Sequence, residues 1–179
     1  SEIIFTYYWP AYPSEYDGKN PSVTLNDCDG KPLTGKVSQE YAEAARKEGS
    51  AFIEGKLLNL AGCGDSTADN FNIFKEYDGK KYPYGVGSES NPLEPYVSVA
   101  ANDLTFGEFI YVPELDGLPL PDNQVHDGCL RVDDVCGTCD GGHIDFLVAS
   151  SSTYKAIHKE GKFTSCSVQR NSDCRPKKY

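Results

Sequence analysis

Apolar and polar positions along the chain predict short strands and two helices. A β-branched and aromatic run at 3–9, which ends at a proline, is typical of a strand. Residues 38–48 begin with a serine, carry acids early and bases late, and precede a glycine. They therefore predict a helix that starts at a serine cap and stops at Gly49. A second short helix, also with a serine cap, is expected at 151–160, with Gly161 as its stop.

The remaining strand signals are short and widely separated, and no repeat period is present. Strands are expected at 51–60 (one or two), 96–101, 109–112, 129–132, 143–149 and 163–168. The stretch 115–127 is expected to be a loop, and the polar stretch 62–95 carries few strand signals. Several short strands with one or two helices indicate a mainly β protein, built as a small β-barrel with decorations.

Length and charge narrow the class of protein. The 179 residues fit a single domain, 1–179. The 27 acidic residues outnumber the 17 Lys and Arg residues, which gives a net charge of −10, whereas a protein that binds nucleic acid needs a basic face. No apolar run approaches the roughly 18 residues of a membrane span. We therefore expect a monomer that binds neither nucleic acid nor membrane.

The cysteines indicate an oxidising compartment. The chain has no Met, begins at Ser1 directly before an apolar stretch, as a processed secretory product would, and spreads seven cysteines over its length. We expect a secreted, extracellular protein with disulfides. Because seven is odd, one thiol is free or pairs outside the chain, and the connectivity stays open. The cysteines are Cys28, Cys63, Cys129, Cys136, Cys139, Cys166 and Cys174.

Cys136 and Cys139 form a CxxC segment, which is compatible with a redox pair, half of a zinc site or a structural disulfide. A redox motif opens a helix after a strand, but here Asp-Gly-Gly follows and predicts a turn. A zinc site needs a second pair of ligands, and His126, His143 and His158 do not supply one at a suitable spacing. The segment favours a structural disulfide, and we expect neither a metal nor a cofactor.

Asp145 is the main candidate for chemistry. It lies inside the expected strand 143–149, although Asp is depleted in strand interiors. Strand alternation places Ile144 and Phe146 on one face and His143 and Asp145 on the other. A carboxyl among such neighbours is partly desolvated, which raises its pKa and keeps it protonated, as a general acid requires. The alternative is an Asp on the wet face of an edge strand.

Two further acids stand at strand ends. Asp134 comes eleven residues before Asp145 and precedes a turn, and Asp103 follows the strand expected at 96–101. Each of them is ordinary alone, as an acid at a turn or at a strand end. Three acids at the edges of strands could nevertheless converge on one cleft.

Two runs carry a resemblance to a known family. Residues 97–113 (VSVAANDLTFGEFIYVP) resemble the "AVDP-x-x-IPLGT-x-vyip" signature of 3D domains. Residues 132–146 resemble the paired "DtGGaIkG-x-x-iDlf" signature, with the same eleven-residue step between its acids. Membrane-bound lytic transglycosylase A and its relatives share this three-aspartate module, which folds as a double-psi β-barrel. Barwin-like endoglucanases and expansins use the same barrel, with motifs similar to 6–9 (TYYW) and 143–145 (HID).

The resemblance implies a fold and a set of roles. The fold would be a six-stranded double-psi β-barrel with short helices and a long loop insertion at about 11–95. Asp145 would be the catalytic acid, and Asp134 and Asp103 would be neighbouring catalytic aspartates that orient the site and raise the pKa of the acid by like-charge repulsion. The chain departs from the family pattern at 135–137, where Val-Cys-Gly replaces Gly-Gly.

The resemblance also implies a reaction: a secreted muramidase would cleave the β-1,4 bond between N-acetylmuramic acid and N-acetylglucosamine in peptidoglycan. An inverting hydrolase needs a second carboxylate about 6.5–9.5 Å from the acid. Lytic transglycosylation needs one carboxylate and closes a 1,6-anhydro ring. Asp134, Asp103, Asp65 and Glu94 are candidates for a hydrolytic base. Barwin-like endoglucanases carry their base where this chain has Pro10, which disfavours an endoglucanase.

Two other classes of function stay open, an endoglucanase-type polysaccharide hydrolase and a non-catalytic wall-binding protein of the expansin or barwin type. The 12 Tyr, 8 Phe and single Trp suit stacking on sugars. Tyr7, Trp9 and His143 are expected to bind substrate along the groove, and the alternative for the two aromatic residues is a place in the barrel core. Because bacterial walls are anionic and repel a chain of charge −10, we expect an acidic working pH.

Overall fold

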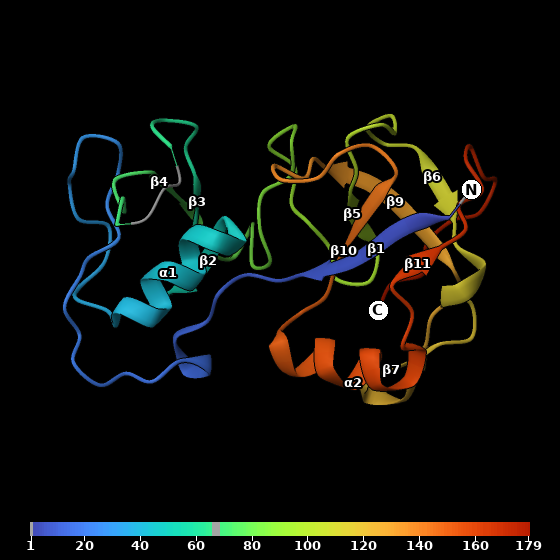
Figure 1. Cartoon of the computed structure of the whole chain (residues 1–179), viewed down its shortest axis with the longest axis horizontal. Coiled ribbons are helices and arrows are strands. Elements are labelled where there is room, and N and C mark those ends of the chain that lie inside the picture. The colour runs from blue at the N-terminus through green and yellow to red at the C-terminus, as the bar shows by residue number, and fades with distance from the viewer. Residues whose placement is uncertain (1, 66–68) are drawn as a thin grey trace. The chain divides into compact units, whose positions relative to one another are not determined.

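The computed structural model describes residues 2–65 and 69–179, and the chain divides into two compact units. The first, called the sheet unit below, consists of Ser1–Tyr8 and Val86–Tyr179 (Figure 1). The second, called the insert unit, is Trp9–Gly85. Within the described ranges, neither α-helix combines the length and the apolar character that crossing a membrane demands.

A six-stranded sheet forms the centre of the sheet unit, in the order β11-β1-β10-β5-β9-β6. The strands are β1 (Ile3–Tyr8), β5 (Ser98–Ala100), β6 (Phe109–Tyr111), β9 (Cys129–Asp134), β10 (His143–Leu147) and β11 (Ser165–Cys166). β1 runs parallel to β10 and β5 parallel to β9, while the other neighbouring pairs are antiparallel. The predicted mainly β fold is confirmed. The closure of these six strands into a double-psi barrel stays a prediction: β11 and β6 end the ladder, and a single bridge links Tyr111 of β6 to Gln169, three residues beyond β11.

Strand alternation gives this sheet a buried face. Phe5 of β1 is buried whereas its neighbour Ile4 is 55% exposed, as expected for a strand with one face in the core. Phe146 of β10 and Val99 of β5 stand opposite each other and are fully buried. The helix α2 (Ser151–Gly161) contributes the fully buried Ile157. The other face of β1 and β10 is therefore the one available to polar chemistry.

The two helices begin at the predicted serine caps. In α1 (Gln39–Glu48) the Ser38 side chain accepts a hydrogen bond from the Tyr41 amide, and Gly49 ends the helix with φ of 80°. In α2 the expected stop is one residue too early, because Lys162 takes the left-handed conformation instead of Gly161. Gly161 is needed for space, since a Cβ there would lie 2.8 Å from the Phe163 ring.

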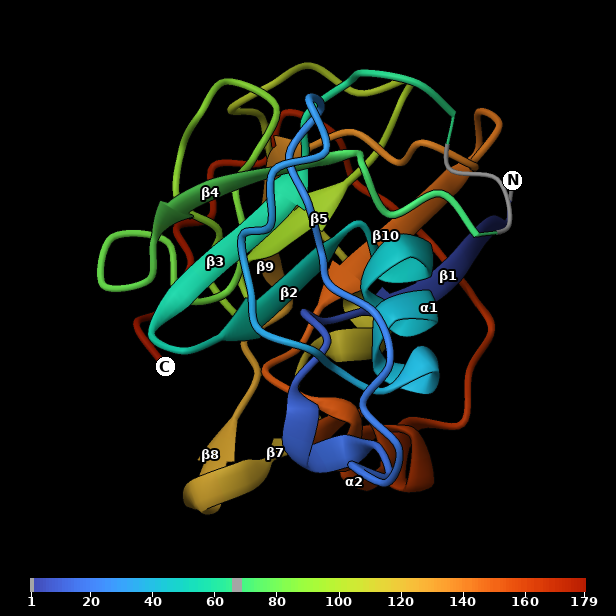
Figure 2. The ribbon, with the colours of Figure 1, turned by 90° about the vertical axis from the view of Figure 1, so that its left-hand side faces the viewer.

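The insert unit has a hydrophobic core of its own. It contains η1 (Pro13–Glu15), α1 and a three-stranded sheet of β2 (Ser50–Ile53), β3 (Lys56–Leu60) and β4 (Phe74–Asp78) in the order β2-β3-β4 (Figure 2). Leu25, Tyr41, Ala45, Leu58 and Phe74 are among its buried core residues. The long loop insertion expected at about 11–95 is thus largely a folded unit. β4 escaped prediction because only Phe74 of its residues is buried.

The segment expected to be a loop at 115–127 contains short regular elements. η2 (Pro113–Leu115) leads into β7 (Pro119–Leu120), η3 (Pro121–Asn123) and β8 (Gln124–Val125), and β7 pairs with β8 as a small antiparallel ladder. These elements are so short that their sequence carries no strand periodicity.

Three disulfides use six of the seven cysteines: Cys28–Cys63, Cys129–Cys174 and Cys136–Cys139. The prediction of disulfides, including a structural one in the CxxC segment, is confirmed. Cys166 on β11 is the free thiol and is buried. Burial raises the pKa of its thiol to about 12, so this group is protonated and inert at neutral pH.

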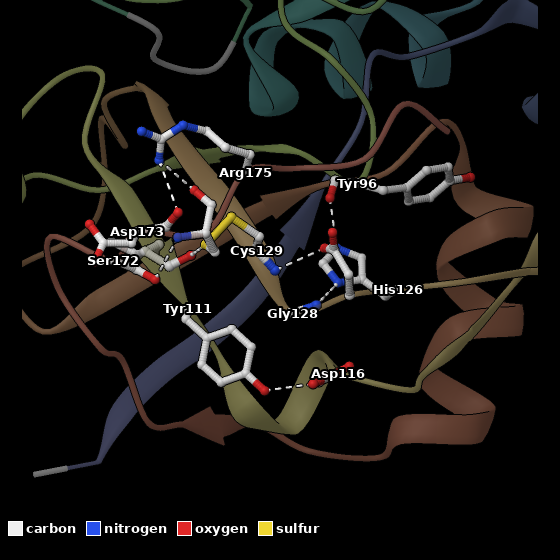
Figure 3. Close-up of a disulfide and its surroundings, with 12 residues drawn as sticks. Tyr96, Tyr111, Asp116, His126, Gly128, Cys129, Ser172, Asp173 and Arg175 are labelled. Atoms are coloured by element: carbon white, nitrogen blue, oxygen red, sulfur yellow. Dashed lines mark hydrogen bonds between the residues drawn. A yellow bond between two sulfur atoms is a disulfide. The ribbon is translucent and has the colours of Figure 1, made fainter.

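The Cys129–Cys174 disulfide ties the C-terminal segment to β9 (Figure 3). Beside it, the buried His126 ring joins two backbone groups. Its Nε2 donates to the Tyr96 carbonyl at 2.7 Å, and its Nδ1 accepts from the Gly128 amide at 2.8 Å (Figure 3). Only a neutral imidazole can make both bonds, and burial lowers the pKa of His126 accordingly. His126 is therefore a structural residue.

Thiol counting tests this arrangement. We expect the native protein to resist a thiol reagent at neutral pH, because Cys166 is both buried and protonated. Unfolding without reductant should expose one reactive thiol, and mass spectrometry should place the label on Cys166. Two or more labels before reduction, or a label on another cysteine, would contradict the disulfide assignment.

Candidate functional site

Asp145 lies at the centre of the sheet, on β10 between β1 and β5. In the strand register it stands opposite Thr6 on β1 and Ala100 on β5. The Thr6 hydroxyl donates a hydrogen bond to Asp145 Oδ1 at 2.9 Å. The sheet therefore fixes both the position of the carboxyl and the direction of one of its oxygens.

His143 completes a short polar chain with these two residues. Its Nε2 lies 2.6 Å from Thr6 Oγ1. Because the Thr6 hydroxyl has one hydrogen and donates it to Asp145, its oxygen accepts from His143, which carries a hydrogen on Nε2. The order is then His143 to Thr6 to Asp145, and all three side chains lie on the polar face of the strands.

Burial raises the pKa of Asp145 above the usual value of an aspartic acid. The hydrogen bond from Thr6 and the positive charge that His143 can carry both favour the ionised form, but they do not offset the burial. The direction is the one expected from the sequence. Asp145 thus keeps its proton to a higher pH than an exposed aspartate does.

Asp134 ends β9 on the other side of β5. In the register it stands opposite Ala100, after a bulge between Val99 and Ala100. The pKa of Asp134 is raised to about 7, mainly by burial and in smaller part by the negative charges of Asp145 and Asp133. The Val135 amide, which donates to Asp134 Oδ1 at 2.9 Å, favours the ionised form.

Tyr8 connects β1 to Asp134. Its hydroxyl donates to Asp134 Oδ2 at 3.5 Å, and burial together with the nearby carboxylates raises the pKa of Tyr8 well above its usual value. Asp134 on β9 and Asp145 on β10 therefore lie on the two sides of Ala100 in β5, and they interact through their charges. The candidate site consists of these two carboxyls with raised pKa values and of two hydroxyl donors from β1.

Asp103 has a different place. It is exposed, and its Oδ2 accepts a hydrogen bond from the Gly142 amide at 2.9 Å, immediately before β10. It is not among the groups that shift the pKa of Asp134 or Asp145. Like-charge repulsion, which the resemblance assigns to the acid Asp145, acts between Asp145 and Asp134 and contributes to the raised pKa of Asp134. The structure thus brings two of the three aspartates together and uses the third at the start of a strand.

Of the aromatic residues expected along the groove, Tyr7 packs among other rings of the sheet unit. The Tyr7 ring contacts Phe5, Phe146, Tyr154 and His158, with centroids 4.9 to 6.0 Å apart, and burial raises its pKa to about 12. Tyr7 thus packs among core residues, which was the alternative to a place along the groove.

Trp9 belongs to the insert unit, where its indole nitrogen is buried. Of the two acids considered outside the strands, Glu94 pairs with Arg131 at 3.1 Å and Asp65 belongs to the insert unit.

Sequence reasoning missed Thr6 and Tyr8 as site residues, although the signal was present. Residues two apart on a strand share a face, so Thr6 and Tyr8 share the face of β1 that meets Asp145, and Tyr7 shares the core face with Phe5. The period of two in the TYYW motif would have selected them. No group of three or more His, Cys, Asp or Glu side chains is arranged to hold a metal ion in the part of the chain that the structure describes.

Comparisons with known proteins agree with this fold. No protein-family model matches the chain, and no curated protein matches it. Among solved structures, Escherichia coli MltA with bound chitohexaose is similar over 94% of this chain and 71% of that chain, with 14% identity and a TM-score of 0.61. The chain shares the fold of MltA. A second E. coli MltA structure, described as having a unique lytic transglycosylase fold, has a TM-score of 0.51, 15% identity and the same coverage. The predicted resemblance to lytic transglycosylase A is therefore confirmed at the level of the fold.

Removing the Thr6 hydroxyl should raise the pKa of Asp145. In Thr6→Val the side chain keeps its branched shape but loses the donor that favours the carboxylate. Carbon-13 NMR titration of the Asp145 carboxyl measures the change. Thr6→Ser, which keeps the hydroxyl, is the matched control and should stay near the wild type. An unchanged or lower pKa in Thr6→Val would contradict the assigned hydrogen bond.

Asp134 should make the protein less stable as the pH rises. Its pKa is raised from an ordinary 3.8 to about 7, so its contribution to stability is complete below about pH 3.8 and is lost as the pH rises through 7. Asp134→Asn removes this titration. We expect its melting temperature, relative to wild type, to rise by several degrees between pH 5 and pH 8.5. The exposed control Asp173→Asn should show a flat difference, and a flat difference for Asp134→Asn as well would refute the shifted pKa.

Proposed function

We propose that this chain is an enzyme that cleaves the β-1,4 bond between N-acetylmuramic acid and N-acetylglucosamine in peptidoglycan, with Asp145 as the general acid. The observation that carries the proposal is the half-buried Asp145 carboxyl with its raised pKa, which accepts a hydrogen bond from Thr6 and lies near Asp134, a second carboxyl with a raised pKa. The fold shared with MltA supports the class of substrate, since that protein is a lytic transglycosylase solved with a chito-oligosaccharide.

The first step is protonation of the leaving oxygen. Because Oδ1 of Asp145 accepts the hydrogen of Thr6, the acidic proton resides on Oδ2, the oxygen left for substrate. Transfer of this proton to the glycosidic oxygen accompanies cleavage of the bond from that oxygen to C1, and positive charge develops on the sugar ring. The resulting Asp145 carboxylate is stabilised because Thr6 donates a hydrogen bond to it and His143 donates one to Thr6.

The second step decides between the lytic and the hydrolytic reaction. In the lytic reaction the C6-hydroxyl of the muramyl sugar bonds to C1, its proton returns to Asp145, and a 1,6-anhydro ring forms without water. In hydrolysis a second carboxylate takes a proton from water, and Asp134 is the candidate because it is half ionised near pH 7. We propose the lytic reaction, since it needs only the one acid and matches the reaction class of MltA.

We infer the working environment from the net charge of the chain and from its disulfides. A general acid must be protonated in the free enzyme, so the rate should fall as the pH rises through the pKa of Asp145. A chain of net charge −10 also meets an anionic wall more readily at acidic pH. Three disulfides support a secreted protein working in an extracellular, oxidising compartment.

Asp145→Asn tests the proposal, because the amide keeps the shape of the acid but has no proton to give. Loss of a general acid should reduce the release of soluble glycan from purified peptidoglycan about 100- to 10,000-fold. The exposed control Asp122→Asn should leave the rate unchanged. Mass spectrometry of the wild-type products should show 1,6-anhydro ends, and reducing ends would assign hydrolysis instead.

Three results would overturn the proposal. Asp145→Asn could fold and retain most of the wild-type rate. The wild type could release no fragments from peptidoglycan but cleave cellulose, which would indicate an endoglucanase. It could also bind walls without releasing any glycan, as a non-catalytic protein of the expansin or barwin type would.

A further inference from the structure

The loop at 135–142 joins the two candidate acids along the chain. It leaves β9 directly after Asp134 and enters β10 two residues before Asp145. Its conformation therefore bears on the position of both carboxyls. This Val-Cys-Gly-Thr-Cys-Asp-Gly-Gly loop is largely exposed and contains three glycines, so it depends on specific contacts and on its disulfide for a single conformation.

One side chain holds the first half of this loop. The Asn102 Oδ1 accepts from the Cys136 amide at 2.9 Å, and its Nδ2 donates to the Cys136 carbonyl at 2.8 Å and to the Cys139 carbonyl at 2.7 Å. The disulfide between Cys136 and Cys139 closes the same segment covalently. The amide of Asn102 is suited to this task because it offers an acceptor and two donors at once.

The second half of the loop is held by the next residue. Asp103 Oδ2 accepts from the Gly142 amide at 2.9 Å, and the Gly142 carbonyl accepts from the Ile4 amide at 2.9 Å. Gly142 has φ of 73°, a conformation that favours glycine. The adjacent residues Asn102 and Asp103 thus contact both halves of the loop, just beyond the end of β5.

The hydrogen bonds between Asn102 and Cys136 also affect the backbone next to Asp134. Because both backbone groups of Cys136 are bonded to Asn102, the Val135–Cys136 peptide has little freedom, and the adjoining Asp134–Val135 peptide is held at its carbonyl by the Ala101 amide at 3.1 Å. The Val135 amide then points back and donates to Asp134 Oδ1 at 2.9 Å. This is the backbone bond that favours the ionised form of Asp134 against burial and against the charges of Asp133 and Asp145.

We propose that Asn102 is a positioning residue, which acts with the Cys136–Cys139 disulfide to hold the loop 135–142 so that the Val135 amide fixes the carboxyl of Asp134 beside Asp145. The inference rests on the proposed function for its effect on glycan cleavage, but the geometry it describes can be measured without any activity. Asn102 contacts no reacting group and acts only through the loop.

The direct test uses the Val135 amide proton as a reporter. In the wild type its NMR resonance should shift as Asp134 ionises near pH 7, because an amide that donates to a carboxyl senses the charge of that carboxyl. The other groups around Asp134 that bear on its charge are Tyr8, Asp133 and Asp145. In Asn102→Ala this pH-dependent shift of Val135 should be lost. The double variant Cys136→Ser, Cys139→Ser should reduce it too, and serves if Asn102→Ala does not fold.

Thr138→Ala is the matched control, since Thr138 is exposed in the same loop and removal of its hydroxyl takes away only a 4.0 Å contact with Cys136 Sγ, leaving the disulfide and the bonds of Asn102 in place. It should keep the Val135 titration and the wild-type rate. On peptidoglycan, Asn102→Ala should lower kcat by about 10- to 100-fold with KM little changed, because Asp134 is then displaced from its position beside the acid Asp145. A role limited to stability would lower the melting temperature and leave both the Val135 titration and kcat of the folded protein as in the wild type.

Retention of the Val135 titration in the folded Asn102→Ala and double-serine variants would overturn the inference. Failure of the proposed function looks different. In that case the wild type would release no glycan, while the Val135 titration would still report whether Asn102 positions Asp134.

Discussion

Burial of the Asp145 carboxyl between β1 and β5 is the constraint on which the rest of the site depends. A carboxylate removed from water is unfavourable unless donors replace its hydration, and here one hydroxyl, that of Thr6, is the side-chain donor that contacts it. The acid therefore holds its proton longer than an exposed aspartate. The sheet register then sets what surrounds it, with Thr6 on one side and, across Ala100, Asp134 on the other.

The neighbouring residues Asp133 and Asp134 show how specific this environment is. Asp133 is buried and satisfied: Arg131 Nε lies 2.7 Å from its Oδ1, and the Ser98 hydroxyl donates to its Oδ2. Asp134 has no cation among the groups that shift its pKa, and it titrates near pH 7. Asp133 thus stabilises the sheet as part of an ion pair. Asp134, the next residue of the strand, has a raised pKa, which lowers the stability of the protein at high pH.

Much of this site follows from strand periodicity alone. An aspartate inside the apolar run 143–149 predicts a desolvated carboxyl. The odd cysteine count predicts one thiol that is free or pairs outside the chain, and Cys166 is the cysteine without a disulfide in the structure. The same periodicity separates Thr6 and Tyr8, which share the face of Asp145, from Tyr7, which shares the face of Phe5.

Other features depend on contacts distant in the chain and could not be predicted locally. The fold of the insert unit rests on packing between Leu25, Tyr41 and Phe74, and of these Leu25 and Phe74 lie in segments with weak strand signals. The role of Asp103 depends on the Gly142 amide meeting it across the sheet, and no spacing in the sequence distinguishes such an acid from a catalytic one. Disulfide pairing likewise needs the fold, since cysteine spacing does not select one connectivity.

The most direct test of this account is the carboxyl titration of Asp145 in the wild-type protein, followed by carbon-13 NMR. The account predicts that Asp145 releases its proton at a clearly higher pH than the usual value of an aspartic acid, because burial opposes its charge. If Asp145 titrates at or below that usual value, the carboxyl is not held as an acid, and the proposed catalysis fails with it.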